Sequence, residues 1–250
     1  TGNKFEFRGV GSAQSIAGPN TTLNTILAEE MEQMAAEIES GKDVMQVIKE
    51  FLAEHKRVIF NGDGYSAEWE VEAQRRGLPN NKNSVDAMKC LKDKKNIELF
   101  SKHTVYTDVE LASRYEILLE GYNKTIQVES LTALKMAKNE IYPAVVSYLN
   151  KISKTALNVK ENGINNDFLV EDVKILSELL SQMKIQMDDL DVKILSAQNY
   201  DGDVMAHAII WRDDVFTAMN TLRETVDTIE TKVDAKYWPM PTYVDLLFGI

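Results

Sequence analysis

Two charged side chains near the start of the chain have the types and spacing to do chemistry. Glu6 and Arg8 lie in the segment Lys4 to Val10, where apolar and charged residues alternate, as in a β-strand. Residues two apart in a strand share one face. On that face, the carboxylate could hold a divalent cation and the guanidinium a phosphate group. Spacing alone favours an ordinary ion pair on an edge strand, and the functional interpretation stays open beside it.

Two loop motifs partly match known ligand-binding signatures. Residues 61–72 place Asp63 third and Glu72 twelfth, as in a calcium loop, but Ser66 stands where the sharp turn requires Gly. An ordinary turn is the better interpretation. The sequence Gly9-Val10-Gly11 follows the predicted strand without the third Gly of a dinucleotide-binding fingerprint, so that class of site is not expected.

The histidines and the cysteine show no ligand or catalytic spacing. His55, His103 and His207 are far apart in the sequence, and none has a His or Cys partner at the spacing of a metal site. Cys90 lies among apolar residues and lysines of a predicted helix, which is typical of a small core residue. A single cysteine excludes an internal disulfide and fits a reducing, cytoplasmic setting.

Helical signals dominate the first half of the chain after a loop over residues 9–19. Each predicted helix has an N-cap residue or a turn at its start. The predicted starts are Asn20 or Thr21 for a helix reaching Ser40, Asp43 for a second, Ser66 for a helix to Arg76, Ser84 for a helix continuing through Leu99, and Thr107 for the next.

Three long apolar series with steps of three and four residues follow beyond about Thr125. Narrow stripes of this kind bury one another by lying side by side, and short connectors at 160–167 and 199–203 predict antiparallel neighbours. Pro143 predicts a kink or a helix start, and the apolar end 244–248 is expected to need a docking surface. The series are Leu169, Val173, Leu176, Leu180, Met183, Met187, Leu190 and Ile194; Trp211, Val215, Met219, Leu222, Val226, Ile229 and Val233; and Ile141, Val145, Tyr148, Ile152, Ala156 and Val159.

The predicted fold class is mainly α, with a short N-terminal strand remnant, several short helices and then an antiparallel bundle of three long helices. Two domains are expected, over residues 1–125 and 126–250. A net charge of -11 argues against binding to nucleic acid or an anionic membrane. The chain opens at Thr1, without an initiator Met and directly before the predicted strand, which suggests a piece cut from a longer protein.

Several strings, in order along nearly the whole chain, resemble the glutamine synthetase family. The strand segment with Glu-x-Arg, followed by Asn20-Thr21-Thr22-Leu23, is similar to a strand, loop and Asn-headed helix of that family. The type III branch in particular is resembled by the strings at 11–20, 60–66, 113–120 and 236–248.

This resemblance implies a parent ligase that joins ammonia to glutamate with ATP, through a γ-glutamyl phosphate and with Mg²⁺ or Mn²⁺. Glu6 matches the metal-ligating Glu, and Arg8 matches the Arg that contacts phosphate and substrate. Gly9-Val10-Gly11 departs from the Pro-Asp usual in the commoner branches. The resemblance also implies a ring-like homo-oligomer, and an isolated piece without the remaining site residues is expected to be inactive. The alternative function is a non-catalytic helical interaction or oligomerisation module.

Overall fold

Helices form the regular structure of the part of the chain that the structure describes. The computed structural model describes residues 14–249, and these residues contain no β-strand. The prediction of a mainly α fold is therefore confirmed. The predicted strand with Glu6 and Arg8 lies outside the described residues and stays a prediction.

Two compact units divide the chain between Tyr115 and Glu116. The division falls inside a single helix, α6 (Asp108–Met136). Unit 1 denotes the described residues up to Tyr115, and unit 2 denotes those from Glu116. The domain ranges 1–125 and 126–250 expected from the sequence stay predictions.

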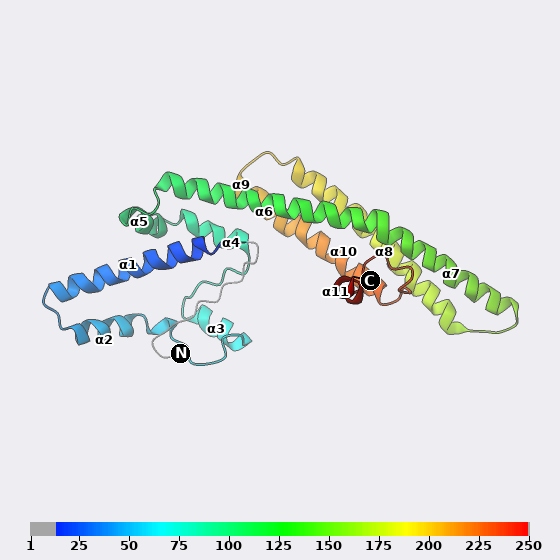
Figure 1. Cartoon of the computed structure of the whole chain (residues 1–250), viewed down its shortest axis with the longest axis horizontal. Helices are drawn as coiled ribbons and strands as arrows, with labels where there is room; N and C mark the ends of the chain where they lie inside the picture. Colours follow the sequence, from blue (N-terminus) through cyan, green and yellow to red (C-terminus); the bar gives the residue numbers. More distant parts are fainter. Residues whose placement is uncertain (1–13, 250) are drawn as a thin grey trace. The chain divides into compact units, whose positions relative to one another are not determined.

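Unit 1 begins with two helices joined by a tight turn (Figure 1). Gly41 has a φ of 98°, in the left-handed region that glycine adopts freely. The next amide, Lys42 N–H, donates to the Glu37 carbonyl across this turn, as at many helix ends. The helices of unit 1 are α1 (Ala17–Glu39), α2 (Val44–Glu54), the 3₁₀ turn η1 (Lys56–Val58), α3 (Ala67–Arg75), α4 (Ser84–Met88), the 3₁₀ turn η2 (Lys89–Lys92) and α5 (Lys94–Lys102).

The predicted caps of α2 and α3 are confirmed, since Asp43 accepts from the Gln46 amide and Ser66 from the Trp69 amide. The first helix begins at Ala17, earlier than predicted. The predicted start at Asn20 or Thr21 was wrong because Pro19 is tolerated in a first turn, where amides lack helical partners.

The single helix predicted from Ser84 through Leu99 is wrong. Asn83 is the cap, and η2 followed by extended Asp93 separates α4 from α5. Asn96 Nδ2 donates to the Cys90 carbonyl over 2.6 Å, which satisfies an acceptor that the broken helix leaves open. The predicted start after Thr107 is confirmed, because Thr107 and Glu110 form reciprocal capping hydrogen bonds.

A helical run continues from α6 through a π-helical turn, η3 (Ala137–Ile141), into α7 (Tyr142–Glu161). Long helices thus begin at Asp108, before the predicted change near Thr125. Pro143 stands in the first turn of α7. The wide turn before it leaves room for a ring that would clash with the carbonyl four residues back in a regular helix.

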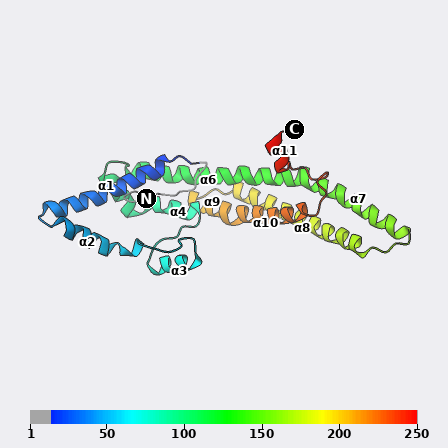
Figure 2. The same cartoon turned by 60° about the horizontal axis from the view of Figure 1, so that its bottom comes forward.

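The longest helix, α8 (Asp167–Gln198), packs on α7 and on α10 (Thr217–Glu230). Figure 1 and Figure 2 show the chain reversing direction between α7 and α8 and again before α9 (Val204–Ile210). A second π-helical turn, η4 (Trp211–Phe216), joins α9 to α10.

The predicted apolar series of α8 lies in the core of unit 2. Its central residues Leu176 to Ile194 are buried, while Leu169 and Val173 at its start are half-buried. The series on α10 and α7 face the same core. The buried members of those two series are Trp211, Val215, Leu222, Ile229, Val233, Ile141 and Val145.

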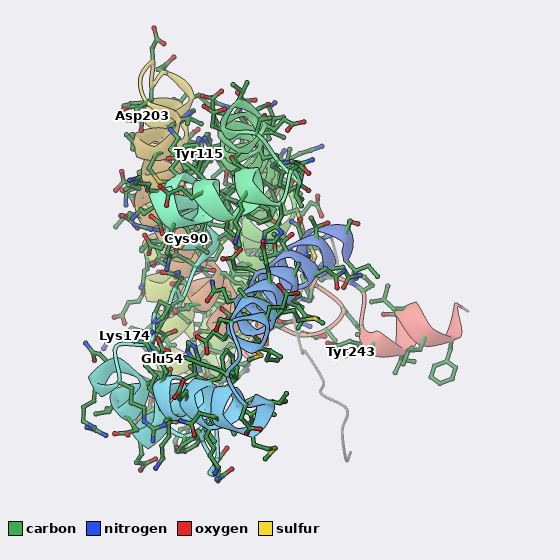
Figure 3. All side chains as sticks on the ribbon, turned by 90° about the vertical axis from the view of Figure 1, so that its left-hand side faces the viewer. Glu54, Cys90, Tyr115, Lys174, Asp203 and Tyr243 are labelled. Atoms are coloured by element: carbon green, nitrogen blue, oxygen red, sulfur yellow. The ribbon has the colours of Figure 1, made fainter. Side chains whose placement is uncertain are left out.

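The end of the described chain is a short apolar helix, α11 (Tyr243–Phe248), capped by Thr242 and Asp245. Its side chains are exposed, with Tyr243 84% and Leu247 73% accessible. Figure 3, in which Tyr243 is labelled, shows them pointing away from the ribbon. The surface that this segment was expected to need is not supplied by the described residues of unit 2. None of the described helices combines the length and apolar character needed to cross a membrane.

Candidate functional site

The predicted site residues Glu6 and Arg8 lie outside the described residues. The structure therefore leaves the metal-binding and phosphate-binding roles as predictions. The helix that follows them in the chain, α1, is described from Ala17 onward. Two polar clusters of unit 1 and one buried pair of unit 2 are the described groups with chemistry of their own.

The first cluster joins the middle of α1 to the end of α5. Glu29 Oε2 accepts from Lys102 Nζ over 2.7 Å and lies 2.7 Å from His103 Nε2. The same ammonium lies 3.0 Å from a carboxylate oxygen of Glu32. The hydrogen bond from Lys102, followed by those from Gln33 and His103, lowers the pKa of Glu29 to about 2. The carboxylate is thus held in its charged form.

Local sequence explains why these side chains meet. Glu29 and Glu32 are three residues apart and therefore share a face of α1. His103 is the C-cap of α5, and Thr104 after it has a φ of 52°. The Val105 amide donates to the Phe100 carbonyl, so α5 ends in the left-handed turn typical of helix C-termini. This turn and the buried ring of Phe100 fix where His103 emerges.

The sequence did not predict this cluster. Its members are 73 and 74 residues apart, and no short motif contains them. The spacing of the three histidines in the sequence indicated no ligand group, whereas His103 Nε2 lies 2.7 Å from Glu29 Oε2 and 3.9 Å from Glu32 Oε2. Only the contact between α1 and α5 reveals the group.

The second cluster surrounds Arg76, at the end of α3. Its guanidinium donates to Glu72 and to the carbonyls of Arg57 and Ile59, and so ties α3 to the preceding loop. The rings of Phe60 and Trp69 stack at 4.0 Å beside it. These contacts hold residues 57–76 together.

In the loop before α3, the side chain of Asp63 is hydrogen-bonded to the backbone of the loop itself. Asp63 Oδ1 accepts from the Tyr65 amide over 2.9 Å, which is the hydrogen bond of an Asx turn. A Cβ atom at Gly62 would lie 2.4 Å from the Phe60 ring, so a larger residue there would displace this ring from its stack on Trp69. These details fit the ordinary turn that the sequence predicts.

We expect Glu72→Gln to flatten the pH dependence of unit 1 stability. Hydrogen bonds from Arg75 and then Arg76 lower the pKa of Glu72 from 4.5 to about 2. Glu72 therefore stays charged in the folded chain when the unfolded chain has begun to bind a proton. Its contribution is present above pH 4.5 and is lost as the pH falls towards 2.

Urea unfolding followed by circular dichroism across this pH window measures the effect. The variant should lose less free energy of unfolding on acidification than the wild type. Glu39→Gln, at an exposed position that ends α1, is the control and should keep the wild-type slope. Equal slopes for Glu72→Gln and the wild type would refute the assignment.

The buried pair lies in unit 2. Trp211 is 2% exposed, and its Nε1–H donates to His207 Nε2 over 2.8 Å. The same His207 nitrogen lies 2.9 Å from the Ala197 carbonyl. It can accept from Trp211 when unprotonated or donate to Ala197 when protonated. The pair joins the end of α8 to the start of η4.

Unit 2 also holds an apolar cavity of about 510 Å³ lined by α6, η3, η4 and α10. Met136, Ile141, Phe216 and Met219 supply much of its wall. The lining contains no His, Cys, Ser or Asp. A cavity of this composition can accept an apolar group, and Glu129, Asn220 and Arg223 are the polar residues of its lining.

The chain is similar in sequence to known proteins along its whole length. Residues 43–160 match the family described as the glutamine synthetase C-terminal domain. The chain is 33% identical to a type-3 glutamine synthetase of Dictyostelium discoideum over 99% of its own length. It is 29% identical to a glutamine synthetase of Bacteroides fragilis over 99% of its length, and 33% identical to one of Butyrivibrio fibrisolvens over 100%.

The chain is similar to glutamine synthetases along its whole length. The resemblance to the C-terminal portion of the type III branch is confirmed. The chain spans 35% to 37% of the length of these relatives, about a third.

Proposed function

We propose that the chain forms the C-terminal part of a glutamine synthetase, a ligase that joins ammonia to glutamate with ATP. The observation that carries this proposal is similarity along the whole chain to three glutamine synthetases. In this proposal the chain supplies one edge of the active site, and the other metal ligands and the nucleotide pocket come from residues beyond it.

Glu6 and Arg8 are the residues we assign to that edge. A carboxylate is a suitable ligand for Mg²⁺ or Mn²⁺, which would neutralise charge on the transferring phosphoryl group. A guanidinium binds phosphate oxygens in a bidentate manner. The roles come from the family resemblance, because both residues lie outside the described range.

For unit 2 we propose an antiparallel bundle of three long helices that serves packing and self-association. The buried series on α7, α8 and α10 supports the bundle. The exposed apolar helix α11 supports association with another copy, in a ring-like homo-oligomer, because apolar side chains gathered on a surface often mark an interface. The single cysteine supports a reducing, cytoplasmic setting.

A non-catalytic interaction module is the alternative function, and α11 is the observation in its favour. The two functions differ in where substitutions act. In the ligase, replacing Glu6 or Arg8 abolishes activity, whereas in a pure module these positions are neutral.

The 250-residue chain by itself is expected to show no turnover in a γ-glutamyl transfer assay with Mn²⁺, ATP-site nucleotide and glutamine. The reason is that Glu6 and Arg8 lack the partners that complete the site. A protein of full family length serves as the positive control. Turnover by the chain alone, above the level of a Glu6→Ala chain, would contradict the proposal.

A further inference from the structure

A group of three metal-ligating side chains lies where α1 meets α5. Glu29, Glu32 and His103 each offer one ligand atom, and these atoms lie within 4.8 Å of one another. Within residues 14–249, this is the one group of three His, Cys, Asp or Glu side chains so arranged. We propose that it binds a divalent transition-metal ion of the Zn²⁺ class, a binding function beyond the ligase role proposed above.

The distances suit a tetrahedral ion. Glu29 Oε2 lies 2.7 Å from His103 Nε2, and Glu32 Oε2 lies 3.9 Å from the same nitrogen. Zinc binds nitrogen and oxygen at about 2.0–2.2 Å, so its ligand atoms lie roughly 3.3–3.5 Å apart. The distance from Glu29 Oε2 to His103 Nε2 must therefore increase, and the distance from Glu32 Oε2 to His103 Nε2 must decrease, each by less than about 1 Å. Side-chain rotation can supply these shifts.

The scaffold favours such a site because its ligands stand on helices. Glu29 and Glu32 are on consecutive turns of α1, and His103 is held at the end of α5 by the turn at Thr104. The side chains of Glu29 and His103 are 20% and 18% exposed, while Glu32 is 57% exposed. The group is thus partly shielded yet open to an ion from solvent, with a fourth position for water.

The ammonium of Lys102 lies where the metal ion is proposed to bind and would compete with it for the two carboxylates. This ammonium lies 2.7 Å from Glu29 and 3.0 Å from Glu32, so a positive charge already bridges the two carboxylates. The Lys102 side chain is 46% exposed, and its long stem can swing into water. A divalent ion that replaces the ammonium would balance the charge of both carboxylates, whereas the ammonium balances that of one.

Ligand chemistry selects the metal. An imidazole nitrogen suits Zn²⁺ and Co²⁺, whereas Mg²⁺ prefers six oxygen ligands in an octahedron. The proposed ion is therefore of a different chemical class from the Mg²⁺ or Mn²⁺ assigned to Glu6. The test below uses metal binding alone, so its failure leaves the ligase proposal unaffected.

The experiment is a titration of the 250-residue chain with Zn²⁺ by calorimetry, and with Co²⁺ by visible absorption. Lys102→Gln should raise the affinity about tenfold because the metal no longer displaces an ammonium. Glu32→Gln and His103→Ala should lower it on the order of tenfold or more. Mg²⁺ should give no comparable binding.

Two controls keep the result decisive. His55→Ala removes a half-buried histidine of unit 1 that belongs to no such group, and it should leave Zn²⁺ affinity unchanged. Glu32 is exposed, so Glu32→Gln should fold as the wild type does, which circular dichroism checks. Absence of Zn²⁺ binding in both the wild type and Lys102→Gln, or equal affinity after loss of His103, would overturn the proposal.

Discussion

Trp211→Ala is expected to lower the free energy of unfolding of unit 2 by about 4 kcal/mol, within the range for truncating a buried Trp. The side chain is 2% exposed in the core shared by α8 and α10. Its removal leaves a cavity and takes from His207 a hydrogen-bond donor. The π-helical turn η4, which begins at this residue, loses its main apolar anchor.

Urea unfolding followed by circular dichroism measures this loss. Phe168→Ala is the matched control, because this aromatic side chain on α8 is 86% exposed. Exposed substitutions of this kind change stability by about 0.5 kcal/mol or less. A loss below about 1 kcal/mol for Trp211→Ala would mean that the core does not depend on this residue.

Glu6→Ala, in a protein of full family length, is expected to lower glutamine-forming activity by roughly 10²-fold or more, since metal neutralisation of the phosphoryl group contributes several kcal/mol. Glu161→Ala, at the exposed end of α7, is the control and should keep wild-type activity. Retained activity in Glu6→Ala would favour the interaction-module alternative.

A charged residue in the apolar series of α8 would test folding and not assembly. Leu180 lies in the core of unit 2, among residues of the same chain. Leu180→Asp would bury a charge and unfold the unit, so loss of assembly would not identify an interface. The exposed side chains of α11, such as Leu247, offer a cleaner test of self-association.

The core of unit 2 could be predicted because burial imposes a period on the sequence. Leu176, Met183 and Leu190 recur at steps that keep one stripe of α8 facing its neighbours. The helix caps Asp43 and Ser66 could be predicted for a similar local reason, since the cap side chain accepts a hydrogen bond from an amide three residues away.

Features that depend on contacts between elements could not be predicted. The period of the side chains does not reveal that η3 carries the helical run past Pro143. Nor does it reveal that the chain becomes extended at Asp93. Glu29 and His103 are 74 residues apart in the sequence, and they meet only because α1 packs against α5.

The candidate active-site pair is a separate case. Alternation around Glu6 and Arg8 predicts a shared strand face but not what that face meets. The family resemblance supplied the metal and phosphate roles. Both residues lie outside residues 14–249, so the assignment rests on that resemblance, and solution measurements can test it.

The manganese dependence of activity tests the central assignment most directly. Proteins of full family length, wild type and Glu6→Ala, are compared in a γ-glutamyl transfer assay over increasing Mn²⁺. We expect the variant to need at least about tenfold more Mn²⁺ for half-maximal activity, together with its lower maximal rate. An unchanged Mn²⁺ titration curve for Glu6→Ala would contradict the role of Glu6 as a metal ligand.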